Sequence, residues 1–253
     1  MQVIALYSNK GGVGKTATAV NLAYLAAQSG YRTLLCDLDP QSSATFYFRV
    51  KPKLKKQARG LTNPGKAIND SIKGTDFENL DLLPADFSHR NLDLTFNEAK
   101  SSKDRLRRVL RPLRKDYDLV FLDSPPTINI LAENIFRAAD HLLVPLIPTT
   151  LSVRTYEQLQ VFLQDGRYKM RMLHSFLSMV DRRKKLHREA EIEIRGRFDN
   201  VLATTIPYLS LVEQMGVKRE PVPVYAPRSQ AARGYSALWT EVRALIDGDV
   251  PSQ

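Results

Sequence analysis

The residues best suited to chemistry lie near the start of the chain, where Ser8–Thr16 reads Ser-Asn-Lys-Gly-Gly-Val-Gly-Lys-Thr. A lysine and a hydroxyl residue that follow closely spaced glycines are typical of a loop that binds a phosphate chain. Glycine lets the backbone N–H groups turn toward the phosphates because it has no Cβ. In such a loop Lys15 contacts the β- and γ-phosphates, and the Thr16 hydroxyl is a ligand of Mg²⁺.

Two predicted elements flank this loop and would hold it in place. The apolar run Val3–Tyr7 predicts a buried strand, and Ala17–Ser29 has apolar residues at helical spacing and ends before Gly30, a residue typical of helix ends. The loop therefore lies at a helix N-terminus, whose partial positive charge favours an anion.

The spacing of the glycines departs from the commonest form of this loop. That form has its first glycine at position 9, which is Asn9 here, while the glycines fall at 11, 12 and 14 and a second lysine stands at position 10. The run Lys10–Thr16 resembles the deviant Walker A box of the ParA/MinD family of ATPases. The resemblance implies ATP and Mg²⁺ as cofactors, and a homodimer in which Lys10 reaches the nucleotide of the other subunit. The nucleotide-binding residues it implies in this loop are Lys10, Gly11, Gly12, Val13, Gly14, Lys15, Thr16 and Ala17.

Acidic residues follow two further predicted strands. Arg32–Cys36 runs into Asp37-Leu38-Asp39-Pro40-Gln41, and an apolar run from position 118 ends at Asp123. The carboxyl ends of parallel strands form the edge where such sheets bind ligands, so these acids are expected near the phosphate loop. By resemblance the metal site consists of Thr16, Asp37 and Asp123, with both carboxylates acting through water. By resemblance the catalytic residues are Lys10, Lys15 and Asp39, which orients or activates the hydrolytic water.

A cluster of basic residues follows another predicted strand, Leu173–Val180. It corresponds in position to the DNA-contacting segment of the ParA family, and Arg183 is the nearest match to the family's DNA-contacting arginine. The alternative is a solvated basic loop at the start of a helix. Contacts to phosphates alone would give DNA binding that is independent of sequence and weakened by salt. The predicted DNA-binding residues are Arg182, Arg183, Lys184, Lys185 and Arg188.

The last predicted strand, Val201–Pro207, is followed by Tyr208-Leu209-Ser210. The ParA family uses the equivalent loop against adenine, with Arg-Asn after the proline. Pro207 and Tyr208 are therefore predicted neighbours of the adenine, although this chain lacks the family's polar pair.

Composition limits the possible function classes. The chain has 253 residues, a net charge of +10 and a single cysteine, Cys36. One cysteine excludes disulfides and Cys-ligated clusters within one chain. The positive charge favours DNA or an anionic membrane as a partner, with a basic but inert surface as the alternative. Neither a membrane helix nor a signal peptide is recognisable, so a cytoplasmic location is expected.

We expect residues 1–253 to form a single α/β ATPase domain. The alternation of strands and helices predicts a doubly wound, mostly parallel β-sheet flanked by helices on both faces, and the resemblance implies the P-loop NTPase fold of the deviant Walker A type. Residues 49–65 are expected to be a basic surface excursion, and residues 86–116 to be helical with a break at Pro112. Neither an N-terminal helix-turn-helix domain nor a C-terminal membrane helix is expected. The other elements expected are strands at 80–83, 142–147, 173–180 and 201–207, and helices at 66–72, 130–139, 151–164 and 231–246.

The function hypothesis follows from the resemblance. It describes an ATPase with slow turnover that dimerises with ATP, binds non-specific DNA of the nucleoid, and is reset when a ParB-like or other adaptor protein stimulates hydrolysis. Its cargo would be a plasmid, a chromosome origin or a protein cluster. One alternative is a MinD-like ATPase that works on a membrane surface, although no membrane partner is expected, and another is a metabolic enzyme with the same loop.

Overall fold

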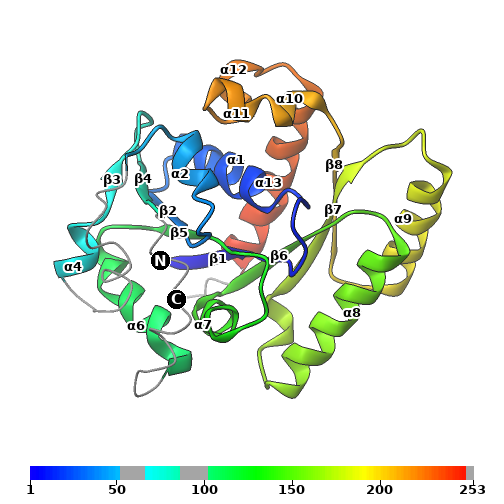
Figure 1. Ribbon diagram of the computed structural model, residues 1–253, viewed down its shortest axis with the longest axis horizontal. Helices are drawn as coiled ribbons and strands as arrows, with labels where there is room; N and C mark the ends of the chain where they lie inside the picture. The colour runs from blue at the N-terminus through cyan, green and yellow to red at the C-terminus, as the bar shows by residue number, and fades with distance from the viewer. Residues whose placement is uncertain (52–65, 86–101, 249–253) are drawn as a thin grey trace.

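The computed structural model describes residues 1–51, 66–85 and 102–248. Its centre is one eight-stranded sheet with the order β3-β4-β2-β5-β1-β6-β7-β8 (Figure 1). Neighbouring strands are parallel, except that β3 runs antiparallel to β4. The strands are β1 (Gln2–Leu6), β2 (Thr33–Asp37), β3 (Lys73–Gly74), β4 (Leu80–Leu83), β5 (Leu119–Asp123), β6 (His141–Leu146), β7 (Leu173–Val180) and β8 (Val201–Pro207).

Helices cover both faces of this sheet (Figure 1). On one side lie α1 (Lys15–Gln28), α2 (Ser43–Tyr47) and α13 (Gln230–Gly248), and on the other α6 (Arg105–Leu110), α7 (Ile130–Ala138), α8 (Thr150–Asp165) and α9 (Lys185–Arg197). The shorter helices are α4 (Lys66–Asn69), α10 (Ser210–Glu213), α11 (Met215–Lys218) and α12 (Val222–Tyr225), with 3₁₀ turns at Ser102–Asp104, Arg111–Lys115 and Met170–Met172.

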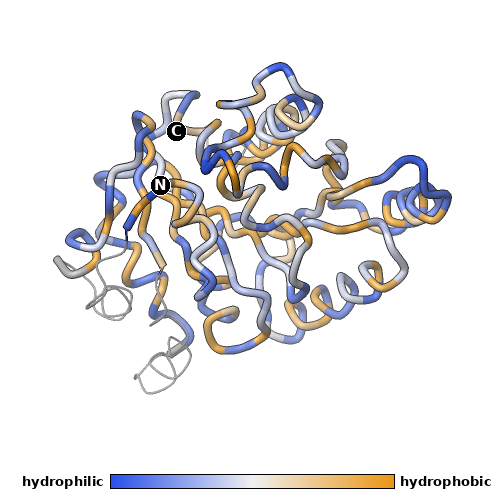
Figure 2. The backbone as a smooth tube through the Cα atoms, turned by 45° about the horizontal axis from the view of Figure 1, so that its top comes forward, coloured by the Kyte–Doolittle hydropathy of each residue, from blue (hydrophilic) through white to orange (hydrophobic). Residues whose placement is uncertain are grey.

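The central strand explains why both faces are covered. Side chains alternate along a strand, so Val3, Ala5 and Tyr7 pack into one core while Ile4 and Leu6 pack into the other. A strand buried on both faces is a continuous apolar run, which is how this segment reads in the sequence. Figure 2 shows the apolar segments of the chain concentrated in the interior. The predicted doubly wound, mostly parallel fold is confirmed.

Most predicted elements are found with bounds that differ by only a few residues. The strand at 80–83 has the predicted limits. The first helix ends at Gln28 with Ser29 as its C-cap, and Gly30 directly after the cap has a positive φ of 89°. Strand β3 was not predicted because a two-residue strand is too short to show an alternating pattern. The helix expected at 66–72 ends earlier, at Asn69.

Between residues 102 and 116 the chain forms short helices, and Pro112 lies in the 3₁₀ turn that follows α6. The rest of that predicted helix, 86–101, and most of the predicted basic excursion, 52–65, lie outside the described residues. None of the helices that the structure describes combines the length and the apolar character needed to span a lipid bilayer.

Candidate nucleotide site

The loop at Ser8–Thr16 has the conformation that its glycines permit. Gly12 and Gly14 have positive φ values of 71° and 91°, and α1 begins directly afterwards at Lys15. Ser178 on β7 fixes the position of the loop, because its hydroxyl donates a hydrogen bond to the Val13 carbonyl at 2.9 Å. A Cβ on Gly14 would lie 3.0 Å from that hydroxyl oxygen. Both the backbone angle and the close approach therefore require glycine at position 14.

Lys15 is held inside its own site. Its side chain is only 7% exposed, and its Nζ donates to the Lys10 carbonyl at 3.0 Å. Burial lowers the pKa of Lys15, and the nearby carboxylates of Asp123 and Asp39 oppose that shift. The ammonium group therefore lies among negative charges at the predicted position of a phosphate chain.

Lys10 differs from Lys15 in its surroundings. It is half-buried, and within the described residues its ammonium group has no hydrogen-bond or ion-pair partner. Its backbone is fixed instead, since its amide donates to the Ser8 hydroxyl at 3.2 Å and its carbonyl accepts from Lys15. Burial lowers the pKa of Lys10. The loop thus anchors the backbone of this residue, while its ammonium group is unpaired among residues 1–51, 66–85 and 102–248.

The strand order brings two predicted metal ligands together. Asp37 ends β2, Asp123 ends β5, and the two residues are register partners on adjacent parallel strands. Both are fully buried, and neither carboxylate oxygen of Asp123 has a hydrogen-bond partner among the described residues. Burial, followed by the charge of Asp37, raises the pKa of Asp123 well above its usual value, and the nearby Thr16 and Lys15 oppose this.

Asp37, unlike Asp123, has hydrogen-bond partners within the part of the chain that the structure describes. One of its oxygens accepts from the Thr45 amide at 2.8 Å and the Thr45 hydroxyl at 2.7 Å, and the other accepts from the Asp39 amide at 3.2 Å. Burial is the largest influence on the pKa of Asp37 and raises it, although the bonds from Thr45 lower it. Asp37 therefore connects the acidic loop, residues 37–41, to α2, which carries Thr45.

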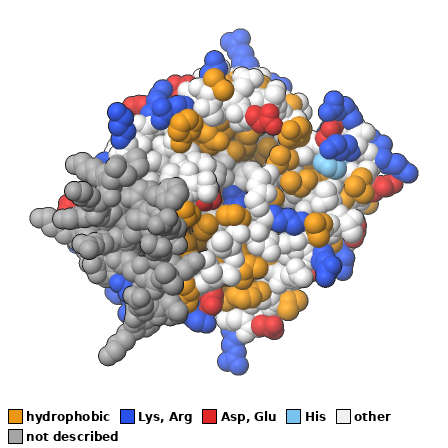
Figure 3. Space-filling view, viewed as in Figure 1, with side chains coloured by type: hydrophobic (Ala, Val, Ile, Leu, Met, Phe, Trp, Pro, Cys, Tyr) orange, Lys and Arg blue, Asp and Glu red, His pale blue; other side chains and the backbone are white. Residues whose placement is uncertain are grey.

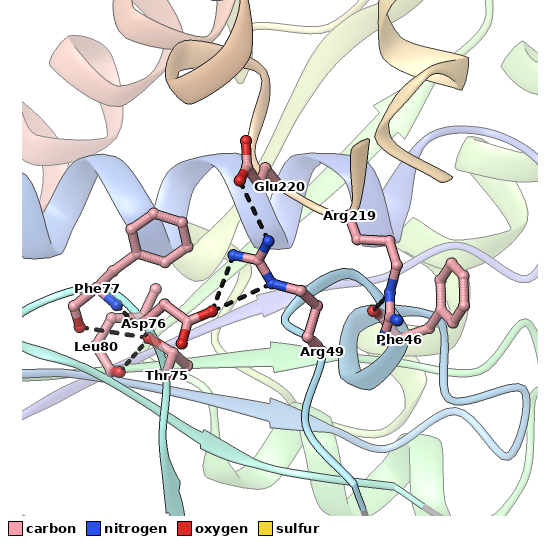
Figure 4. Close-up of polar contacts among 8 residues, drawn as sticks. All are labelled: Phe46, Arg49, Thr75, Asp76, Phe77, Leu80, Arg219 and Glu220. Atoms are coloured by element: carbon pink, nitrogen blue, oxygen red, sulfur yellow. Dashed lines mark hydrogen bonds and ion pairs between the residues drawn. The ribbon is translucent and has the colours of Figure 1, made fainter. Parts of the chain in front are cut away.

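The far end of α2 is fixed by two arginines (Figure 4). The Arg219 guanidinium donates to the Phe46 carbonyl at 3.0 Å and lies 4.4 Å from the centre of the Phe46 ring. Arg49 forms ion pairs with Asp76 at 2.9 Å and with Glu220 at 3.3 Å. The segment after Asp39 is thereby connected to the chain that leads from α11 to α12.

The remaining predicted residues of the phosphate and metal site lie beside these groups. Asp39 is half-buried, and its carboxylate accepts from the Gln41 amide at 2.9 Å. Thr16 and Ala17 are half-buried in the first turn of α1. Thr45 and Ser178 complete the site and were not predicted, because no sequence motif marks a residue that acts only through tertiary hydrogen bonds.

Pro207 and Tyr208, the predicted adenine neighbours, line a cavity of about 480 Å³ at the carboxyl ends of β7 and β8. Tyr208 is exposed, and its hydroxyl donates to Glu213 at 3.0 Å. The same cavity is lined by Arg182 and Arg183, which were predicted to contact DNA. The structure therefore brings the predicted adenine residues and part of the predicted DNA surface to one hollow.

The predicted DNA-binding residues, Arg182, Arg183, Lys184, Lys185 and Arg188, are all exposed where β7 leads into α9. Figure 3 shows Lys and Arg side chains gathered over this end of α9. Two members of the cluster form ion pairs, because Arg183 contacts Asp181 at 2.9 Å and Lys185 contacts Glu189 at 3.3 Å. The cluster nevertheless keeps an excess of positive charge on an open surface.

Comparison with known proteins agrees with this geometry. The family model AAA_31, described as an AAA domain, matches residues 1–179. The chain is 31% identical over 252 residues to the sporulation initiation inhibitor protein Soj of Bacillus subtilis, and the alignment covers 96% of this chain and 98% of the relative. It is 32% identical to the chromosome-partitioning ATPase Soj of Thermus thermophilus, with 96% of each chain covered.

Among solved structures, the fold matches a cobyrinic acid a,c-diamide synthase from Mycobacterium smegmatis with bound ATP analog and magnesium. The TM-score is 0.82 at 26% identity, and the match covers 98% of this chain and 96% of the other. The two-lysine loop, the paired aspartates and the near-complete alignment with two Soj proteins lead to one conclusion. The chain belongs to the ParA/MinD family of P-loop ATPases and is a Soj-like member of it.

Proposed function

We propose that this protein is an ATP-driven dimerisation switch that positions a cargo on DNA. Two subunits pair when ATP and Mg²⁺ occupy the loop at Ser8–Thr16, and the pair binds non-specific DNA of the nucleoid. Hydrolysis, stimulated by a ParB-like or other adaptor protein, separates the subunits. Intrinsic turnover is slow, and the cargo is a plasmid, a chromosome origin or a protein cluster.

The different surroundings of the two lysines carry this proposal. Lys15 is buried within its own site, whereas the Lys10 ammonium has no partner among the described residues although its backbone is fixed. A fixed backbone lowers the entropy that an interaction with a second subunit's phosphates would cost. This arrangement supports a role for Lys10 across a dimer interface and for Lys15 within one subunit.

Exposed apolar side chains around the site also support pairing. Ile128, Leu151 and Phe46 follow the carboxyl ends of β5, β6 and β2, and they are 58%, 62% and 49% exposed. Large apolar side chains around one functional edge are typical of an interaction surface. A second copy of the same surface would remove them from water.

The buried acids fit a magnesium ion. A fully buried carboxylate without a hydrogen-bond partner, as at Asp123, is costly unless a cation balances its charge. Thr16 and Asp37 lie beside it, and oxygen ligands are those that Mg²⁺ prefers. When bound, Mg²⁺ would offset negative charge on the phosphates.

The protein's own groups have separate roles in hydrolysis. Lys15 and the partner subunit's copy of Lys10 offset the charge that develops on the transferred phosphoryl group. Asp39 orients the attacking water, and the bond from its amide to Asp37 fixes the acidic loop relative to the metal ligands. Pro207 and Tyr208 contact the adenine. All of these residues belong to one sheet and its loops, which supports treating residues 1–253 as a single ATPase domain.

Substitutions of the two lysines test the proposal. Lys15→Ala should abolish ATP binding, whereas Lys10→Ala should bind ATP but remain monomeric in light scattering with ATP and Mg²⁺. If Lys10→Ala dimerises as well as the unmodified protein, the assigned role of Lys10 is wrong.

The DNA surface is tested by reversing charge in the basic cluster. Arg183→Glu with Lys184→Glu should abolish ATP-dependent retention on DNA and leave ATP binding intact. The matched control is Lys115→Glu with Lys218→Glu, because both lysines are exposed and lie outside the cluster. Equal retention by the two double variants would exclude the cluster as the DNA surface.

A metabolic enzyme is the second candidate, favoured by the fold match to the diamide synthase at 26% identity. A switch releases ADP and phosphate without changing another substrate, so product analysis separates these two functions. Retention on anionic vesicles, compared with retention on DNA, separates both from a MinD-like membrane ATPase. We propose that the protein acts in the cytoplasm at the nucleoid.

A further inference from the structure

The sheet has a second charged hollow at the edge opposite the nucleotide site. This amino-edge cavity, of about 640 Å³, lies where β1, β6 and β7 begin, between α6, the end of α7 and the segment 167–172. Its basic lining residues are Arg107, Arg108, Arg111, Arg114, Arg137, Arg167 and Lys169, and its acidic ones are Asp104 and Asp140.

The amphipathic pattern of α6 explains why so many arginines face this cavity. Leu106, Val109 and Leu110 form the buried face of α6, and Arg107 and Arg108 lie on its exposed face. Arg107 lies on α6 and Arg111 is the residue that follows it, at the start of the 3₁₀ turn Arg111–Lys115. Arg111 keeps helical backbone angles, so these two arginines, four residues apart, lie on the same side of the segment. The helix and the turn together thus place four arginines, Arg107, Arg108, Arg111 and Arg114, at the rim of the cavity.

Few of these positive charges are compensated. Asp104 is 4.0 Å from Arg137, which also lies 5.6 Å from the centre of the Tyr168 ring. Asp140 accepts a hydrogen bond from the Val3 amide at 2.9 Å. Within residues 1–51, 66–85 and 102–248, no acidic side chain pairs with the other basic residues of the cavity, which are Arg107, Arg108, Arg111, Arg114, Arg167 and Lys169.

The buried part of the lining is apolar, with Leu110, Phe136 and Met172 among its residues, whereas the basic residues are exposed at the rim. Binding here would therefore depend on charge, because no buried polar side chain of the lining could orient one particular small molecule. A row of arginine and lysine side chains that recognises only charge suits a ligand with regularly spaced negative charges. Arginine pairs well with phosphate oxygens.

We propose that the amino-edge cavity is a second contact surface for the phosphate backbone of DNA. It lies at the opposite edge of the sheet from Lys10, Lys15 and the basic cluster at the start of α9. Its own contribution to DNA affinity is therefore the same with ATP and with ADP, and the ATP-dependent part of DNA binding belongs to the basic cluster at the start of α9. In a pair of subunits joined at their nucleotide sites, the two cavities face outward, so one pair can bridge separate DNA segments.

The test measures the affinity for a short mixed-sequence duplex with ADP and with ATP, at about 50 to 200 mM salt. Arg111→Glu with Arg114→Glu should weaken binding about tenfold in both nucleotide states and reduce the salt slope by about 1.8, or 0.9 per phosphate contact. The control is Lys115→Glu with Lys218→Glu, which makes the same charge change outside the cavity and should change affinity less than twofold.

If both double variants weaken DNA binding equally, the proposal is wrong, because the change in the protein's net charge would then explain the whole effect. If Arg111→Glu with Arg114→Glu weakens DNA binding with ATP but not with ADP, the proposal is also wrong. Two further probes are inorganic tripolyphosphate and vesicles of anionic phospholipid. If either binds the unmodified protein through Arg111 and Arg114 while DNA does not, the cavity has a different anionic ligand. Unchanged ATP turnover would show that the double variant is folded. The affinity measured with ADP tests the cavity even if the proposed ATP-dependent dimerisation is wrong.

Discussion

Asp37 and Asp123 stand side by side at the ends of two adjacent parallel strands, and both carboxylates are fully buried. Thr45 and the Asp39 amide satisfy Asp37, whereas Asp123 has no hydrogen-bond partner among the described residues. Two neighbouring buried carboxyl groups destabilise the folded protein unless protons or nearby cations balance their charge. The arrangement therefore favours the protein with its cation bound and lowers the stability of the nucleotide-free protein.

Asp123→Asn should stabilise the nucleotide-free protein by roughly 1–3 kcal/mol, because it removes one of two adjacent buried carboxylates and the burial cost outweighs the attraction of the nearby Lys15. The same substitution should remove the additional stabilisation that Mg²⁺ gives beyond ATP alone. Thermal unfolding of both proteins, with and without Mg²⁺ and ATP, measures both effects. A variant that is less stable without nucleotide, or that keeps the full effect of Mg²⁺, would contradict this view of Asp123.

Gly14→Ala should destabilise the protein by about 1–2 kcal/mol, because φ at this position is 91° and the new Cβ would crowd the Ser178 hydroxyl. Gly11→Ala is the matched control, since its Cβ would have no neighbour within 4 Å and its φ is not positive. Urea unfolding of the two variants tests the difference. Equal stability would show that the loop relaxes freely around position 14.

Arg219→Ala should loosen α2, because it removes both the ring contact and the hydrogen bond to Phe46, worth about 1–2 kcal/mol together. Lys218→Ala, one residue earlier at an exposed position, is the control. Hydrogen exchange at the Thr45 amide, which donates to Asp37, provides the measurement. Exchange at this amide should be faster in Arg219→Ala and unchanged in Lys218→Ala. Arg219→Ala should also hydrolyse ATP more slowly.

The loop between β7 and α9 should respond to acid through His187. Its Nδ1 accepts from the Asp181 amide at 3.1 Å, which only the neutral ring can do. Burial, followed by the charge of Lys184, lowers the pKa of His187, and Asp181 opposes this. Because the folded pKa is depressed, the stabilisation is complete above about pH 6.5 and is lost as the pH falls below it.

The protection factor of the Asp181 amide against hydrogen exchange should accordingly fall as the solution is acidified. His187→Asn keeps an acceptor that does not titrate, so protection in this variant should be independent of pH over the same range. The same loss of protection in both proteins would show that His187 is not the titrating group.

The sequence predicted the sheet and the phosphate site because both depend on local patterns. A strand buried on both faces, such as Val3–Leu6, is a continuous apolar run, and the Lys10–Thr16 motif specifies its own turn and helix start. The aspartates at the ends of β2 and β5 were predicted near this loop because parallel strands end at one edge.

Other features depend on contacts between distant residues and could not be predicted. Thr45 and Ser178 act through hydrogen bonds to residues 8 and 165 positions away. The segment with Arg107, Arg108, Arg111 and Arg114 was predicted to be helical, and only the fold shows that these arginines share one hollow with Arg137 and Lys169. Short helices such as α10, α11 and α12 are too brief to show a periodic pattern.

The mass of the Asp39→Ala variant in solution tests the central claim most directly. Without Asp39 hydrolysis should stop, so ATP and Mg²⁺ should hold the variant as a dimer that remains on DNA. Light scattering should give the mass of a dimer with ATP and the mass of a monomer with ADP, and adding Lys10→Ala should restore the monomer. A variant that binds ATP and stays monomeric at saturating ATP and Mg²⁺ would contradict the account.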